Sequence, residues 1–129
     1  MSNYIFESQF QNESSQATVR LILFHFIDEN DIHFVYSPFL DLSGYGQSER
    51  EAKASFKIAF SDFISYTMNK KTLAKVLKEL GWKVKGSLKS PKKISMPDMA
   101  TSIKNKKYIS ELFNKYPIQT YHQEVAIPA

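Results

Sequence analysis

The side chains able to do acid–base or metal chemistry in this 129-residue chain are few and widely separated. The histidines are His25, His33 and His122, and none stands in the H-x-x-x-H or H-x-x-E spacing of a metal site. Each is interpreted as a strand residue that makes one hydrogen bond. The chain has no cysteine, so neither disulfides nor thiolate zinc sites are available to it.

Acidic residues between positions 28 and 41 are the next candidates for chemistry. They are Asp28, Glu29, Asp31 and Asp41. They could be imagined as magnesium ligands, but the first three stand in a predicted turn, where short polar side chains bond the backbone. The chain also lacks a G-x-S-x-G motif, a Walker loop and a dinucleotide fingerprint. The sequence therefore predicts a protein that is not an enzyme and that uses no metal or cofactor.

Charge is divided unevenly along the chain. Residues 1–69 hold four basic and nine acidic side chains, a net charge of −5, whereas residues 70–129 hold thirteen basic and four acidic ones, a net charge of +9. The basic half favours an acidic or phosphate-rich partner, although the solvated lysines of an ordinary loop give the same composition. The candidate nucleic-acid-binding residues are Lys83, Lys85, Lys89, Lys92 and Lys93.

The strongest strand pattern lies at residues 18–27, where apolar side chains occupy both sets of alternating positions. Such a strand is expected at the centre of a sheet, with both faces covered by helices or by a partner subunit. A turn at residues 28–31 returns the chain into an antiparallel strand at 32–37. Pro38 ends that strand, because proline donates no backbone hydrogen bond.

A long amphipathic helix follows a second turn. Gly44 and Gly46 predict a chain reversal, and Ser48 with Glu51 forms an S-x-x-E capping box that begins the helix. The expected buried stripe is Ala52, Phe56, Ala59, Phe60, Phe63 and Thr67. This helix is predicted to be the main cover of the core, since each buried phenylalanine contributes about 1.5–3 kcal/mol.

The remaining predicted elements are shorter. Thr72 begins a helix that Gly81 ends in a left-handed conformation, with Trp82 packed back on the last turn. Further along, the patterns predict a strand at 83–85, a loop at 86–98, a helical turn at 99–103, a helix at 107–115 and a closing strand at 119–127. Residues 1–17 are expected to be an N-terminal arm or an edge strand.

A chain of this length forms one domain with a real core. The predicted class is α+β, a mainly antiparallel sheet with helices packed on one face, an extra C-terminal helix and a closing strand. Within it, residues 18–84 form the core and residues 85–129 a C-terminal extension. No apolar run reaches the length of a membrane span and no signal-peptide pattern begins the chain, so a cytosolic location is the simplest expectation.

Several short motifs together resemble the HicB-like antitoxin domain. They are a strand ending in Tyr36-Ser37-Pro38-Phe39-Leu40-Asp41, the turn Gly44-Tyr45-Gly46, a helix opened by Glu51-Ala52, and a shorter helix ending in Leu80-Gly81-Trp82. The resemblance covers residues 20–84. It implies a partial ribonuclease-H-like β-β-β-α core without nuclease activity, in a protein that is usually a homodimer.

The resemblance also implies a role in a type II toxin–antitoxin system. In such a system the protein masks a small basic HicA-type toxin that cleaves mRNA, and many members repress their own operon through a C-terminal module that binds operator DNA. Here Pro97 and the short segment 99–103 leave no room for a full first helix of that module. An ordered C-terminal cover of the sheet is therefore favoured over operator binding.

Two functions from different classes follow. As an antitoxin, the protein would bind its toxin through residues 32–46 and the outer side of the sheet, where the acidic N-terminal half has the complementary charge. The candidate partner-binding residues are Asp28, Glu29, Asp31, Tyr36, Pro38, Asp41 and Tyr45. For each acidic residue, a turn or a solubilising charge is an equally good interpretation. The alternative function is a solitary regulator that binds DNA or RNA through the basic region 83–107.

Overall fold

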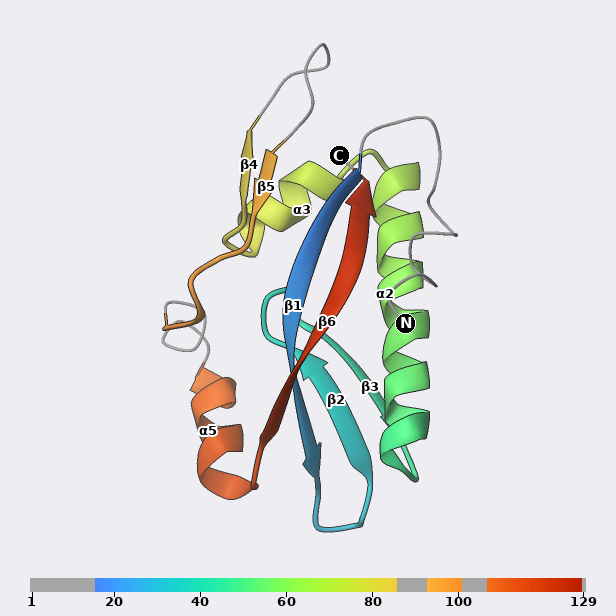
Figure 1. Ribbon diagram of the computed structural model, residues 1–129, viewed down its shortest axis with the longest axis vertical. Helices are drawn as coiled ribbons and strands as arrows, with labels where there is room; N and C mark the ends of the chain where they lie inside the picture. The colour runs from blue at the N-terminus through green and yellow to red at the C-terminus, as the bar shows by residue number, and fades with distance from the viewer. Residues whose placement is uncertain (1–15, 86–92, 101–106, 129) are drawn as a thin grey trace.

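A four-stranded antiparallel sheet organises the chain, as the computed structural model shows (Figure 1). The structure describes residues 16–85, 93–100 and 107–128. Its elements are β1 (Gln16–Ile27), β2 (His33–Ser37), β3 (Leu42–Gly46), α2 (Glu49–Asn69), α3 (Leu73–Glu79), β4 (Lys83–Lys85), β5 (Lys93–Ser95), α5 (Lys107–Lys115) and β6 (Gln119–Pro128). The described part of the chain is thus α+β, as predicted.

Strand β1 lies inside the sheet, whose order is β3-β2-β1-β6. It pairs with β2 through the predicted turn, placing Phe26 opposite Phe34, and with β6 along most of its length. The closing strand therefore joins the same sheet as the predicted core. The predicted position of β1 inside the sheet is therefore confirmed. A strand with apolar side chains on both faces can bury both of them only inside a sheet that is covered on both sides.

The two faces of β1 pack against different helices. Val19, Leu21 and Leu23 belong to the core cluster that contains the buried face of α2, whereas Phe24 and Phe26 pack with Ile109 of α5. Figure 1 shows α2 and α5 flanking the sheet. The prediction that the helices pack on one face is wrong, since the second apolar set of β1 also needs a cover and α5 provides part of it.

Helix α2 begins at the predicted capping box. The backbone N–H of Glu51 donates to Ser48 Oγ at 3.1 Å, and Glu51 Oε1 accepts in return from the N–H of Gln47 at 2.8 Å. The buried residues of the helix are Ala52, Phe56, Phe60, Ile64 and Thr67. Ile64 takes the place predicted for Phe63, which is only partly buried, because the stripe continues at intervals of four residues from Phe56.

The predicted chain reversal at Gly44 and Gly46 is wrong. Both glycines lie within β3, and the chain reverses at residues 38–41, where Asp41 has a left-handed φ of 56°. The glycines are needed for close approach of the next helix. A Cβ added at Gly44 would lie 2.2 Å from the backbone nitrogen of Phe56, so only glycine lets α2 pack this near to the strand.

The segment after α2 closes one end of the core. Gly81 has a φ of 96°, and the N–H of Trp82 donates to the carbonyl of Leu77 at 2.9 Å, which confirms the predicted helix stop. Trp82 is 3% exposed and its Nε1 donates to the carbonyl of Phe39 at 2.7 Å. Thr72 makes no side-chain cap hydrogen bond within the described part of the chain.

The predicted strand at 83–85 is present as β4, and β5 pairs with it. The prediction of a continuous loop at 86–98 is therefore wrong at residues 93–95. Of the predicted arm at residues 1–17, the last two residues belong to β1 and residues 1–15 lie outside the described residues, as do residues 86–92 of the predicted loop and residues 101–103 of the predicted helical turn. The predicted helix at 107–115 is confirmed as α5, and no described helix is long and apolar enough to cross a membrane.

Candidate functional site

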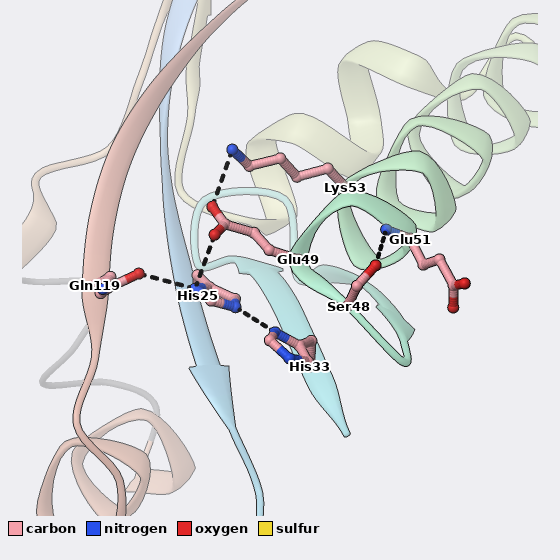
Figure 2. Close-up of polar contacts among 7 residues, drawn as sticks. All are labelled: His25, His33, Ser48, Glu49, Glu51, Lys53 and Gln119. Atoms are coloured by element: carbon pink, nitrogen blue, oxygen red, sulfur yellow. Dashed lines mark hydrogen bonds and ion pairs between the residues drawn. The ribbon is translucent and has the colours of Figure 1, made fainter. Parts of the chain in front are cut away.

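A polar network centred on the buried His25 joins β1 and β2 to β6 and to the start of α2 (Figure 2). His25 is 5% exposed; its Nε2 lies 2.9 Å from Nδ1 of His33, and its Nδ1 lies 3.0 Å from Oε1 of Gln119. Glu49 Oε1 lies 4.0 Å from the same Nδ1. The prediction of isolated histidines with one hydrogen bond each is wrong for His25, which is bonded at both nitrogens.

The proton positions in this network follow from its acceptors. With the amide oxygen of Gln119 facing the ring, Nδ1 of His25 carries a proton, because that oxygen can only accept. In neutral His25, Nε2 then accepts from the Nδ1–H of His33. Both nitrogens of His25 are thus occupied by neighbours and cannot also serve a substrate or a metal. Within the described ranges, no group of three or more suitable side chains is arranged to hold a metal ion.

Glu49 connects the histidines to the surface. Lys53 Nζ donates to Glu49 Oε2 at 3.0 Å, and this hydrogen bond holds the pKa of Glu49 below its usual range. The carboxylate also lies in the first turn of α2, where the helix dipole favours negative charge. These contacts fix the start of α2 against the sheet, so the network positions the neighbouring β2–β3 hairpin.

A second polar cluster lies on the opposite face of the sheet, where two phenols share one carboxylate. Tyr36 donates to Asp41 Oδ1 at 2.8 Å, and Tyr108 of α5 donates to the same oxygen. The two hydroxyl oxygens are themselves 2.8 Å apart. Burial, followed by the bonds to Tyr108 and Asp41, raises the pKa of Tyr36 well above its usual range. The cluster therefore ties α5 to the β2–β3 turn.

The turn between β1 and β2 is built by its own acidic residues. Asp28 Oδ1 accepts from the backbone N–H groups of Asn30 and Ile32, both at 2.9 Å, and Asp31 has a left-handed φ of 63°. Glu29 Oε2 accepts from the hydroxyl of Tyr116, which directly follows α5, at 2.6 Å, and this hydrogen bond lowers the pKa of Glu29. Asp28 thus stabilises the turn, which was the alternative interpretation of this residue. Glu29 also holds the end of α5 in place.

Beyond the reach of α5, the same face of the sheet carries an exposed apolar surface. Phe34 and Tyr45 are cross-strand neighbours beside the buried Phe26, and the ring centroids of Phe34 and Tyr45 are 6.1 Å apart. Tyr45 is 66% exposed. We call this region the β2–β3 surface, a depression of about 460 Å³ lined by Ile32, Phe34, Tyr45, Gly46, Gln47 and Glu51.

The candidate partner-binding residues occupy three different environments. Tyr45 lies on the β2–β3 surface, and Asp28, Glu29 and Asp31 lie in the turn that leads to it. Tyr36 and Pro38 are buried and cannot form part of an exposed surface. Asp41 is exposed, but it is bonded to the two tyrosines.

Three of the candidate nucleic-acid-binding lysines, Lys83, Lys85 and Lys93, belong to β4 and β5. Lys85 and Lys93 are partners across the hairpin of these two strands, and Lys83 is exposed at its base. Lys89 and Lys92 lie outside the described residues. The hairpin projects away from the four-stranded sheet (Figure 1), so it lies apart from the β2–β3 surface.

Sequence reasoning missed several residues that matter here. Glu51 was assigned only to a cap, and Phe34 lay within the predicted binding segment 32–46 but was not selected as a contact residue beside Tyr45. The signal was available in the turn at 28–31, because pairing β1 with β2 across it places Phe34 beside Phe26 and brings His33 diagonally opposite His25. Tyr108 could be connected to Asp41 only by long-range packing.

Comparisons with protein-family models, curated proteins and solved structures found no match to this chain. The resemblance to the HicB-like antitoxin domain, and the ribonuclease-H-like relationship that it implies, stay predictions based on the motif residues.

Proposed function

We propose that this protein is a non-catalytic antitoxin of the HicB-like kind, which masks a small basic mRNA-cleaving toxin by binding it on the β2–β3 surface. The observation that carries the proposal is the exposure of Tyr45 beside Phe34 on the sheet face that α5 covers only in part. Exposed apolar patches with polar rims are typical of protein-binding sites, and tyrosine is enriched at their centres.

The charge around this surface supports a basic partner. Glu51 lines the depression, and the turn beside Ile32 carries Asp28, Glu29 and Asp31. Negative charge at the rim accelerates the encounter with a positively charged partner and disfavours acidic ones. Residues 1–69 as a whole carry a net charge of −5, which is also complementary to a basic partner.

A search for a gene that encodes a small basic protein beside this one, followed by co-expression of the two proteins, tests the proposal. We expect the neighbour to arrest growth when expressed alone and the wild-type chain to restore growth. Tyr45→Ser should lose the rescue, because it removes the most exposed ring of the β2–β3 surface. Tyr66→Ser is the matched control, since Tyr66 is 64% exposed on α2.

Three results would contradict the proposal. They are the lack of a gene for such a neighbour, a neighbour whose toxicity the wild-type chain does not relieve, and equal rescue by Tyr45→Ser and wild type. Comparable expression of the two tyrosine variants, measured in the same cells, excludes a folding defect as the cause of a lost rescue.

A second candidate function is DNA or RNA binding by the β4–β5 hairpin. It is favoured by the register that sets Lys85 opposite Lys93, with Lys83 on the same strand as Lys85. Binding through phosphates should weaken steeply with salt, because each contact releases a counterion. Nucleic-acid binding by the hairpin would be excluded if the affinity did not change with salt concentration. It would also be excluded if binding were unchanged after replacement by Gln of Lys83, Lys85, Lys89, Lys92 and Lys93.

A further inference from the structure

We infer that the toxin is held by strand addition: an extended basic segment of that partner pairs with β3 and adds an antiparallel strand to the sheet. The inference rests on the proposed function and names the way in which its partner is bound. Strand β3 ends the sheet on its side and, within the described part of the chain, pairs with β2 alone. Its five residues span about 17 Å, which is a typical strand length.

The backbone of β3 lacks the features that usually protect an edge strand. Leu42 to Gly46 pair with β2 residue by residue, so the strand contains no bulge. It has no proline and no charged side chain, and Ser43 and Tyr45 are exposed. In an antiparallel ladder, alternate residues of an edge strand direct their N–H and C=O groups away from the sheet. A segment that pairs with these groups gains main-chain hydrogen bonds.

The two faces of the sheet beside β3 differ, and they select a segment of alternating apolar and basic residues. On the α5 side, Tyr45 and Phe34 are apolar parts of the β2–β3 surface. On the α2 side, a Cβ added at Gly46 would lie 2.4 Å from the Cβ of Glu51, whose carboxylate accepts the N–H of Gln47. Successive side chains of a strand point to opposite faces. One set therefore contacts Tyr45 and the other approaches Glu51.

The charges of α2 favour a basic segment over an acidic one at this edge. Lys53 and Lys57 line a groove on the side of the helix that faces β6, and Arg50 lines an adjoining groove with both lysines. Glu51 lies on the other flank of the helix, in the depression beside β3. A basic segment along β3 thus approaches a carboxylate, whereas Glu51 repels an acidic segment or a phosphate.

Fluorescence anisotropy of the full chain with a labelled hexapeptide of alternating Val and Lys tests the inference. We expect saturable binding, weakened about three- to fivefold when each Lys of the peptide is replaced by Gln. Two N-methylated peptides test the pairing itself, because only one alternate set of peptide N–H groups faces β3. N-methylation of one set, either the Val or the Lys residues, should weaken binding by about tenfold or more, and N-methylation of the other set by less than about twofold.

The protein variant that sharpens the test is Ser43→Lys. A lysine on an edge strand disfavours pairing and repels a basic peptide, so the affinity for the Val–Lys peptide should fall about fivefold. Ser65→Lys is the matched control, because Ser65 is exposed on α2 outside the depression beside β3, and it should change the affinity by less than about twofold.

Three results would overturn the inference. They are the lack of saturable binding of the Val–Lys peptide, equal effects of the two N-methylations, and equally tight binding of a Val–Glu hexapeptide. Amide exchange in residues 42–46 that slows as the concentration of the chain alone is raised would assign the edge to a second copy instead.

The co-expression experiment separates this inference from the proposed function. A wild-type chain that does not relieve the toxicity of its neighbour contradicts the proposed function. Rescue by the wild type, combined with equal effects of the two N-methylations, overturns strand addition alone.

Discussion

The two faces of the sheet are built in different ways. On the α2 face, Phe56, Phe60 and Ile64 are almost completely buried, and Gly44 brings the helix backbone into contact with the strand. On the α5 face, Phe113 and Tyr108 are still 41% and 44% exposed, and hydrogen bonds from tyrosines to carboxylates hold the helix at its margins. We infer that the α2 face supplies most of the stability, which leaves the α5 face free to carry an uncovered aromatic surface.

The largest expected difference between the faces comes from removing one phenylalanine from each. Phe60→Ala should lower the free energy of unfolding by about 3–5 kcal/mol, because it opens a cavity in a fully buried layer. Phe113→Ala should cost about 1 kcal/mol, since it loses mainly an edge-on contact with Phe24 at 5.0 Å between centroids. Urea unfolding followed by Trp82 fluorescence measures both. Equal losses would contradict the proposed division between the faces.

The next largest effect tests how closely α2 approaches the sheet. Gly44→Ala should cost about 2 kcal/mol or more, because its Cβ would overlap backbone atoms of Phe56 and Ala52 that cannot rotate away. Ser43→Ala, at the exposed neighbouring position of the same strand, is the control and should stay within about 0.5 kcal/mol of wild type. Thermal unfolding of the two variants decides. If Gly44→Ala unfolds at the same temperature as the wild type, the close approach of α2 to β3 does not contribute to stability.

Alkaline pH should weaken the α5 face. Burial raises the pKa of Tyr36 and of Tyr108, so both phenols stay protonated in the folded protein where those of the unfolded chain begin to ionise near pH 10. A raised folded-state pKa gives stability that is fully present below the unfolded pKa and is lost as pH rises through the folded pKa. Above pH 10 the stability difference between wild type and Tyr36→Phe should therefore shrink, by up to about 1.4 kcal/mol per pH unit.

Urea titrations of both proteins at several pH values between 9 and 11 measure this change. The Tyr36→Phe variant also corrects for the ionisable groups that do not contact Tyr36, because their contribution is the same in the two proteins; Tyr108, which is hydrogen-bonded to Tyr36, is not among them. A constant difference across this range would show that the Tyr36 hydroxyl is not protected on folding.

The smallest expected effect concerns how α5 begins. Its first turn contains Lys107 and no acidic residue, whereas α2 begins with Glu49, Glu51 and a Ser48 cap. Lys107→Glu should raise the free energy of unfolding by about 0.5 kcal/mol, because a negative charge is favoured at a helix N-terminus. Lys107→Gln should give about half of the gain. If Lys107→Glu is instead less stable than the wild type, Lys107 makes a contact that stabilises the protein by more than the interaction of a negative charge with the helix dipole.

Local patterns predicted much of this fold. The alternation in β1, the capping box at Ser48 and the left-handed stop at Gly81 depend on near neighbours, and each was correct. Gly44 was misassigned because its reason is the backbone of Phe56, which only the folded packing brings near. The side on which α5 packs was missed for the same reason.

The candidate site was predicted less completely than the fold. Tyr45 was selected and is exposed, but Tyr36 was selected from the same motif and is buried. The pairing of His25 with His33, and of Tyr108 with Asp41, depends on strand register and on long-range packing. A motif gives residue types at a spacing, whereas exposure depends on what the rest of the chain places above each residue.

The most direct test of the central claim is amide hydrogen exchange of the chain alone and in the presence of the small basic protein that we propose it neutralises. We predict that the partner slows exchange in residues 32–46 and leaves residues 83–85 and 93–95 unchanged. Protection confined to the β4–β5 hairpin, with residues 32–46 exchanging as in the free chain, would contradict binding on the β2–β3 surface.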